Sequence, residues 1–161
     1  MTRADAFSRD MCTALREKCG LDWQCGKPQK GNRECVDVVG KKESKDRVLI
    51  EVELRRGAPL QNVVKIWRQL SRGALPKDVV LFQAFSSVYD KNGTRRQMAA
   101  FIGREMTKAY PRMRYIQLSM DYSPRKRLSG QAVIRGGGRR KQHAVKLARR
   151  IVARLRKMRT A

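Results

Sequence analysis

Residues 35–56 read CVDVVGKKESKDRVLIEVELRR, and this stretch decides the fold that the sequence predicts. Three acids, Asp37, Glu51 and Glu53, alternate with valine, isoleucine and leucine in its two halves. Alternation of apolar and polar residues is typical of a strand with one buried face, so each half predicts a strand. The polar segment 40–47 between the two halves predicts a hairpin loop.

The register of this hairpin brings the acids together. If the hairpin is symmetric about Ser44, Asp37 lies opposite Glu51, and Glu53 follows one diagonal step further on. Opposed residues on one face have β-carbons about 4.5–5.5 Å apart, and like charges at that distance repel. A hard divalent cation, Mg²⁺ or Mn²⁺, stabilises such a cluster of oxygens, with water or phosphate completing its shell. The alternative is a solvated hairpin face whose acids pair with nearby arginines and lysines.

The net charge points to a polyanionic partner. The 161 residues contain 38 Lys+Arg and 14 Asp+Glu, a formal charge of +24. From Pro124 onward there are 14 Lys/Arg and no acid. Nucleic acid is the expected partner, with DNA ranked above RNA, and an anionic membrane is the alternative. A glycosidase also uses paired acids but acts on neutral sugars, and a Ser or Cys hydrolase needs a histidine base, whereas the single histidine, His143, lies in the basic tail.

The N-terminus has no signal-peptide pattern, and no apolar run approaches the length that spans a bilayer. We therefore expect a cytoplasmic, nucleoid-associated protein without a membrane partner. Its four cysteines are irregularly spaced and form no C-x-x-C pair, so reduced thiols are expected rather than a zinc site.

The remaining sequence alternates predicted helices and strands, which indicates an α/β protein with a mixed sheet flanked by helices. Beyond the hairpin these elements are a helix over 4–19, a short strand within 21–27, a helix over 60–72, a central strand over 78–88, a helix over 94–109 and a strand over 114–120. Residues 1–123 form one predicted domain, and residues 124–161 form a basic helical extension.

Helical periodicity predicts which side chains of the two middle helices face the core. For residues 60–72 the inward residues are Val63, Ile66, Trp67 and Leu70, and those on the other side are Gln61, Lys65, Arg68, Gln69 and Arg72. For residues 94–109, with Thr94 as N-cap, the inward residues are Met98, Phe101, Ile102 and Met106.

The basic extension predicts an amphipathic helix over 139–158. Its apolar stripe consists of Ala144, Leu147, Ile151, Leu155 and Met158. This stripe needs a cover, which is either its own domain or a second subunit in a homodimer. The charged side is available to phosphates, and a helix lying on a membrane surface has the same pattern.

A helix, a hairpin that carries D…ExE, a second helix and a strand of the type LFQAF resemble the core of the PD-(D/E)XK nuclease superfamily. The resemblance covers about residues 8–90 and rests on a short motif. It implies a restriction-endonuclease-like fold and a divalent-metal-dependent phosphodiesterase. The implied metal ligands are Asp37, Glu51 and the carbonyl group of Val52.

The chain departs from the family pattern at the usual motif lysine, where Glu53 stands, and at the proline before the first acid, where Val36 stands. Some restriction enzymes carry Glu at the lysine position, and in other members the lysine has moved to the following helix. Lys65, with Gln69 nearby, is then the substitute that the resemblance implies. If neither substitute works, the domain has kept the fold and lost cleavage.

The sequence thus predicts an Mg²⁺- or Mn²⁺-dependent endonuclease that hydrolyses DNA, with Glu53 or Lys65 orienting the attacking water. The alternative is a non-catalytic nucleic-acid-binding protein, such as a degenerate nuclease or a packaging or ribosome-associated factor. The predicted contacts to the nucleic-acid backbone are Arg55, Arg56, Arg68, Arg125, Lys126, Arg127, Arg139, Arg140 and Lys141.

Overall fold

The computed structural model describes residues 3–26, 36–54, 58–89, 92–122 and 137–159. In this part of the chain the elements are α1 (Arg3–Arg16), β1 (Asp22–Cys25), β2 (Val38–Lys42), β3 (Lys45–Glu53), α2 (Pro59–Ser71), β4 (Val80–Phe85), α3 (Thr94–Ala109), β5 (Arg114–Ser119) and α4 (Gly137–Arg159). The predicted α/β class and the predicted order of elements are confirmed.

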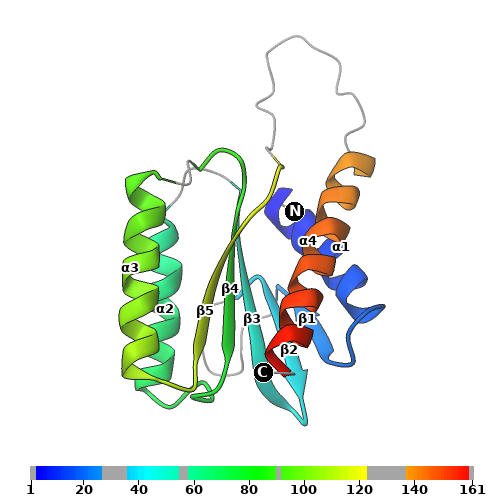
Figure 1. The fold of residues 1–161 in the computed structure, drawn as a ribbon. Coiled ribbons are helices and arrows are strands. Elements are labelled where there is room, and N and C mark those ends of the chain that lie inside the picture. Colours follow the sequence, from blue (N-terminus) through cyan, green and yellow to red (C-terminus); the bar gives the residue numbers. More distant parts are fainter. Residues whose placement is uncertain (1–2, 27–35, 55–57, 90–91, 123–136, 160–161) are drawn as a thin grey trace.

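The five strands form one mixed sheet in the order β1-β2-β3-β4-β5. The first three strands are an antiparallel meander, and β3, β4 and β5 are parallel. Helices α2 and α3 cover one face of the sheet, and α1 and α4 cover the other (Figure 1). The crossovers through α2 and α3 leave the carboxyl ends of the three parallel strands at one edge of the sheet.

The β2–β3 hairpin has the predicted register over its inner part. Val38 pairs with Ile50 and Val39 with Leu49. The predicted loop over 40–47 is wrong, because both strands continue to a two-residue turn at Glu43 and Ser44, where both φ angles are positive. Turns with this twist match the twist of the paired strands. A register shift after Gly40 accommodates the tighter turn.

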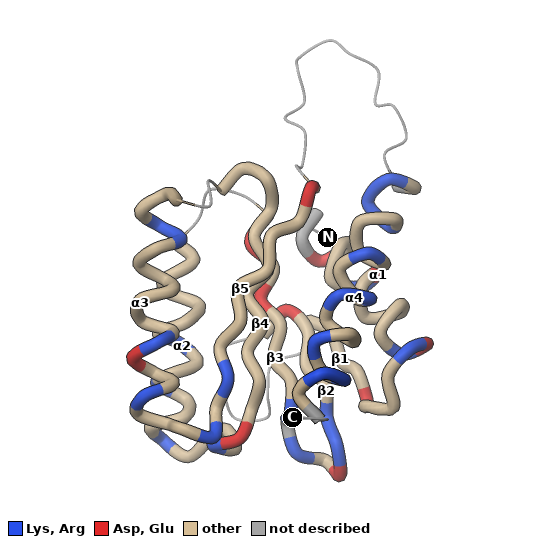
Figure 2. Tube along the Cα trace, viewed as in Figure 1, with Lys and Arg blue, Asp and Glu red and all other residues tan. Residues whose placement is uncertain are grey.

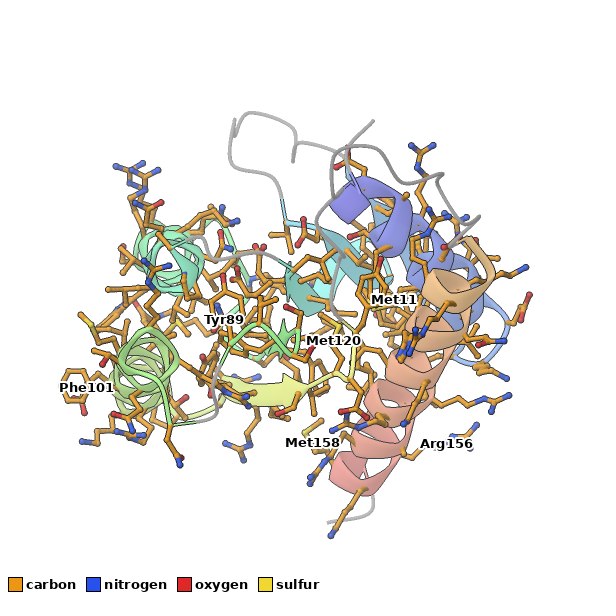
Figure 3. All side chains as sticks on the ribbon, turned by 90° about the horizontal axis from the view of Figure 1, so that it is seen from above. Met11, Tyr89, Phe101, Met120, Arg156 and Met158 are labelled. Atoms are coloured by element: carbon orange, nitrogen blue, oxygen red, sulfur yellow. The ribbon has the colours of Figure 1, made fainter. Side chains whose placement is uncertain are left out.

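The sheet separates two hydrophobic cores. The core under α1 and α4 includes Phe7, Met11, Trp23 and Ile50, all fully buried. The predicted apolar stripe of α4 packs into this core, so its cover is the protein's own domain. Figure 3 shows Met11 on α1 between the sheet and α4.

The second core lies between the sheet and the α2–α3 layer, and here the predicted face of α3 is correct for Met106 and Ile102 but wrong for two other residues. Met98 and Phe101 were expected inside but are 49% and 53% exposed, and Phe101 points outward from α3 (Figure 3). The buried residues of α3 are Ala99, Gly103 and Met106. The ring of Tyr115 on β5 determines which face of α3 packs on the sheet. A β-carbon at position 103 would lie 2.1 Å from this ring, so only glycine fits there. The N-cap is Gly93, one residue before the predicted Thr94.

On α2, the buried residues include Val63, Ile66 and Leu70, as predicted. Gln69 was expected on the opposite side but is 1% exposed, so that expectation is wrong. In the part of the chain that the structure describes, no helix has the length and apolar character needed to cross a membrane.

Candidate active site

A row of polar side chains crosses the parallel strands near their carboxyl ends. Glu51 of β3 is in register with Gln83 of β4, which is in register with Gln117 of β5. The row lies on the sheet face covered by α2 and α3, since Leu49 and Leu81, two residues earlier on their strands, belong to that core. Open α/β sheets bind ligands outside the carboxyl ends of their strands, so this edge is where a site is expected.

Asp37 reaches the same edge from the residue that precedes β2. Its Oδ2 accepts a hydrogen bond of 2.7 Å from the backbone N–H of Val52. The Asp37 side chain thus accepts a hydrogen bond from a backbone N–H of β3 that lies just beyond Val38 and Ile50, the last paired residues of the hairpin. Burial raises the pKa of Asp37, while this hydrogen bond and the Lys65 ammonium act in the opposite direction.

Glu51 is the most constrained of the three acids. It is 3% exposed, and its Oε1 lies 2.6 Å from Nζ of Lys65, which projects from α2. Burial raises the pKa of Glu51 to about 8, and the neighbouring charge of Asp37 contributes in the same direction. The ammonium of Lys65 opposes this rise but does not cancel it, so without a bound cation the carboxyl group of Glu51 keeps its proton at neutral pH.

Glu53 is buried two residues further along β3, close to the start of α2. Its Oε1 accepts hydrogen bonds from Nδ2 of Asn62, at 2.9 Å, and from Nε2 of Gln83, at 2.8 Å. Both donors are amides and carry no charge. Glu53 is therefore held by neutral groups and raises the pKa of both Asp37 and Glu51.

Behind Glu53, a chain of hydrogen bonds crosses the sheet to α3. The hydroxyl of Tyr115 donates to Oε1 of Gln83 at 2.6 Å, and Nε2 of Gln117 donates to the hydroxyl of Tyr115 at 2.8 Å. Arg96 on the first turn of α3 donates to Oε1 of Gln117 at 3.1 Å. Burial raises the pKa of Tyr115 to about 12, so its hydroxyl stays protonated and remains a donor. The orientation of Glu53 is thus fixed by two strands beyond its own.

Each acid keeps one oxygen outside these contacts. The hydrogen bonds involve Oδ2 of Asp37, Oε1 of Glu51 and Oε1 of Glu53. Within the described ranges, the second oxygen of each group accepts no hydrogen bond. These three oxygens are the atoms through which the acids are able to bind a cation or a water molecule.

The described residues contain no group of three or more His, Cys, Asp or Glu side chains arranged to hold a metal ion. Mg²⁺ commonly uses only one or two carboxylates and takes its remaining ligands from water and phosphate. Asp37 and Glu51, each with a raised pKa and one oxygen outside the hydrogen bonds, fit such a two-carboxylate site. Lys65 competes with a cation for Glu51, because its ammonium already contacts that carboxylate.

Asp37, Glu51, Glu53 and Lys65 lie in one neighbourhood: Lys65 contacts Glu51, and the charges of Asp37 and Glu53 both raise the pKa of Glu51. Val52 takes part through its N–H group, which binds Asp37. Two residues of α2 contact the acids: Asn62 binds Glu53, and Lys65 binds Glu51. Gln69 lies one helical turn beyond Lys65, and so further along α2 from Glu53 than Asn62 and Lys65.

The predicted nucleic-acid contacts are scattered over the molecule. Arg55, Arg56, Arg125, Lys126 and Arg127 lie outside the described residues. Of the others, Arg68 is exposed on α2, and Arg139 and Lys141 are exposed at the start of α4. Arg140 binds the carboxylate of Asp10 on α1 at 2.7 Å, which ties α4 to α1.

Sequence reasoning missed the residues that orient Glu53, namely Asn62, Gln83, Tyr115, Gln117 and Arg96. One signal was available: Gln83 is a lone amide inside the apolar run VVLFQAF, and a buried amide needs partners. Comparisons of the chain with protein-family models, with curated proteins and with solved structures gave no match. The site is therefore interpreted from its own geometry.

Proposed function

We propose that this protein is a divalent-metal-dependent nuclease that hydrolyses phosphodiester bonds of DNA. The observation that carries the proposal is the contact of Glu51 with Lys65 at the carboxyl edge of the sheet, where burial and the nearby charges of Asp37 and Glu53 raise the pKa of Glu51 to about 8. A bound cation would stabilise the ionised form of such a buried carboxyl group. A surplus of 38 basic over 14 acidic residues suits an anionic substrate.

The PD-(D/E)XK resemblance is consistent with this proposal at the level of element order. Its pattern of a helix, a hairpin with D…ExE, a helix and a strand matches α1, β2–β3, α2 and β4. Lys65, the implied substitute for the motif lysine, contacts Glu51 directly. These agreements support the proposed restriction-endonuclease-like fold and the proposed activity together.

Asp37 and Glu51 would hold Mg²⁺ or Mn²⁺ through their unengaged oxygens. The bound ion supplies positive charge that polarises the scissile phosphate and lowers the pKa of a water molecule. Lys65 is placed to hold that water or a phosphate oxygen, because its Nζ lies between Glu51 Oε1, at 2.6 Å, and Asn62 Oδ1, at 3.3 Å. Attack of the water on phosphorus breaks one P–O ester bond, and the leaving oxygen takes up a proton.

The contribution of Glu53 follows from its neutral donors. Asn62 and Gln83 fix Oε1, which leaves Oε2 as an acceptor of defined position. An acceptor held this way aligns the attacking water with phosphorus without reorganising during the reaction. Glu53 and Lys65 together would thus perform the orienting work that the family assigns to its motif lysine.

A second candidate function is nucleic-acid binding without cleavage. It is favoured by the fact that each acid already has a partner: Val52 N–H for Asp37, Lys65 for Glu51, and Asn62 with Gln83 for Glu53. A degenerate nuclease would retain such a network as a structural feature. A packaging or ribosome-associated factor belongs to the same class.

Incubation of purified protein with plasmid and with branched DNA, with and without Mg²⁺ or Mn²⁺, separates the two functions. The nuclease proposal expects metal-dependent cuts that disappear in Asp37→Ala and in Glu51→Ala. Asp10→Ala is a matched control, because it removes a carboxylate that binds Arg140 on the α1–α4 side of the sheet. Salt-sensitive binding without cuts, unchanged in Asp37→Ala, would support the non-catalytic function instead.

A further inference from the structure

Helix α4 has one buried and one exposed side, and the buried side is fully used by the domain. Ala144, Leu147, Ala148, Ile151 and Leu155 all pack into the core shared with α1. An amphipathic helix binds a membrane surface by inserting its apolar face. The apolar stripe of α4 therefore has no area left for a membrane or for a second copy of the chain.

The exposed side of α4 is a continuous basic surface. Residues 139, 146, 149, 150 and 157 follow one another at the spacing of a single helix face and are all Arg or Lys. Arg154 and Arg156 flank this row and are exposed as well, and Figure 3 shows Arg156 directed away from the sheet. At about 1.5 Å per residue the row is about 27 Å long. Figure 2 shows these basic positions along the whole of α4.

Most of this charge is not neutralised by the protein. Residues 137–159 contain ten Lys/Arg and no acid, so ion pairs within the helix are impossible. Lys146 contacts Asp121 at 3.5 Å, where both groups are exposed, and Arg150 donates to the carbonyl of Ser119. Within the described part of the chain, Arg149, Arg154 and Arg156 have no carboxylate partner. Concentrated charge of one sign is costly to the folded state, which favours an external anion as its partner.

The character of the surface selects among polyanions. A single-stranded nucleic acid is usually held by aromatic side chains that stack on its bases, and residues 137–159 contain no Phe, Trp or Tyr. A row of cations about 27 Å long matches the backbone of about eight base pairs, at about 3.4 Å per pair. We infer that the exposed face of α4 is a docking surface for the phosphate backbone of duplex DNA, separate from the candidate active site.

The two regions lie on opposite faces of the sheet. The acids belong to the face covered by α2 and α3, whereas α4 covers the other face with α1 (Figure 1). The α4 surface therefore contributes affinity rather than chemistry, and it holds DNA without reading its sequence. The choice of DNA over RNA rests on the proposed function, while the phosphate-binding role does not.

Binding is tested in EDTA with the full chain, by fluorescence anisotropy of a labelled DNA duplex over a series of KCl concentrations. The α4 variant is Arg149→Gln/Arg154→Gln/Arg156→Gln. The control is Arg72→Gln/Lys77→Gln/Arg104→Gln, which removes the same charge from exposed residues on the α2–α3 side. A third variant, Arg149→Lys/Arg154→Lys/Arg156→Lys, preserves the charge of α4.

The α4 variant is expected to lower the slope of log K against log salt by about 3 and to weaken binding on the order of 10- to 100-fold at low salt. The control and the lysine variant should retain the wild-type slope. Equal slopes for the α4 variant and the control would overturn the inference. All changes are at exposed positions, and thermal unfolding followed by circular dichroism verifies that each variant folds.

Two further ligands test the identity of the partner. Duplex RNA and vesicles that contain phosphatidylserine are titrated under the same conditions. Tighter binding of either one than of duplex DNA, lost in the α4 variant, would assign the surface to that partner and overturn the inference. The binding assay is run in EDTA, whereas cleavage needs the metal ion, so a failed nuclease assay and a failed docking surface are distinguishable.

Discussion

Lys65 Nζ on α2 lies 2.6 Å from Glu51 Oε1 on β3, and both side chains are largely withdrawn from solvent. This contact joins two residues that are 14 positions apart in sequence, across the layer between helix and sheet. It pairs a buried acid with the lysine that the family resemblance implies as a substitute for the motif lysine. The first prediction concerns this pair.

Lys65→Met should abolish most DNA cleavage while the protein remains folded. The change removes the cation beside Glu51 and the group that would hold water or phosphate, and losses of about 100- to 10,000-fold are typical of such groups. Lys77→Met, at an exposed lysine after α2, is the matched control. Single-turnover cleavage of plasmid DNA measures the activity of both variants. Equal activity would show that Lys65 takes no part in cleavage.

Glu51 makes stability depend on pH in a definite direction. Its pKa is raised to about 8 in the folded protein from the ordinary value of 4.5. Between these values the folded state keeps a proton that the unfolded chain has lost. The free energy of unfolding of the metal-free protein therefore falls as pH rises through this window.

Glu51→Gln removes this titration and should flatten the pH dependence, with a difference of up to about 5 kcal/mol across the window. The amide oxygen of Gln still accepts from Lys65, so that contact is retained. Urea unfolding in EDTA at a series of pH values measures the effect. A wild-type protein whose stability rises with pH relative to Glu51→Gln would contradict the assignment.

Tyr115→Phe tests the hydrogen-bond chain behind Glu53. Removal of the hydroxyl leaves Oε1 of the fully buried Gln83 without its donor, at a cost of about 1–3 kcal/mol. Gln83 is then held only by the two contacts of its Nε2, with Glu53 and the carbonyl of Pro59, so it orients Glu53 less firmly and cleavage should fall further than stability alone explains. Tyr110→Phe, in the same core, is the control. Chemical denaturation measures the effect on stability, and kcat at saturating DNA measures the effect on cleavage. A variant with unchanged kcat would show that the hydrogen-bond chain behind Glu53 has only a structural role.

Gly103→Ala tests how α3 is seated on the sheet. A β-carbon at this position would lie 2.1 Å from the Tyr115 ring, so ring or helix must move, at a cost of about 1–3 kcal/mol or more. Gly20→Ala is the control, because nothing lies within 4 Å of its β-carbon position. Thermal unfolding of both variants checks the prediction, and equal melting temperatures would contradict the close packing of Gly103.

Periodicity predicted most elements because each long segment has one clear apolar face. The hairpin register followed from the alternation around Asp37 and Glu51, since a one-residue slip would place the two acids on opposite faces of the sheet. The turn was not predictable in the same way. Glu43 and Ser44 both adopt positive φ, a conformation for which their residue types give no signal.

Met98 and Phe101 of α3 were wrongly expected inside because large apolar residues were given more weight than small ones. Gly103 lies against the sheet because the ring of Tyr115 fills the space in front of it. That contact depends on the parallel pairing of β4 with β5, which sequence pattern does not fix. For the same reason the alignment of Gln83 with Gln117 and Glu51 emerged only from the three-dimensional structure.

Soaking crystals in Mn²⁺ and calculating an anomalous-difference map tests the central proposal most directly, because it locates the ion without relying on activity. We predict one strong peak within bonding distance, about 2.0–2.3 Å, of a carboxylate oxygen of both Asp37 and Glu51. Lys65 should remain within hydrogen-bonding distance of Glu51 Oε1 while the ion binds the unengaged oxygens of the two acids. A map without a peak there would contradict the metal-dependent nuclease.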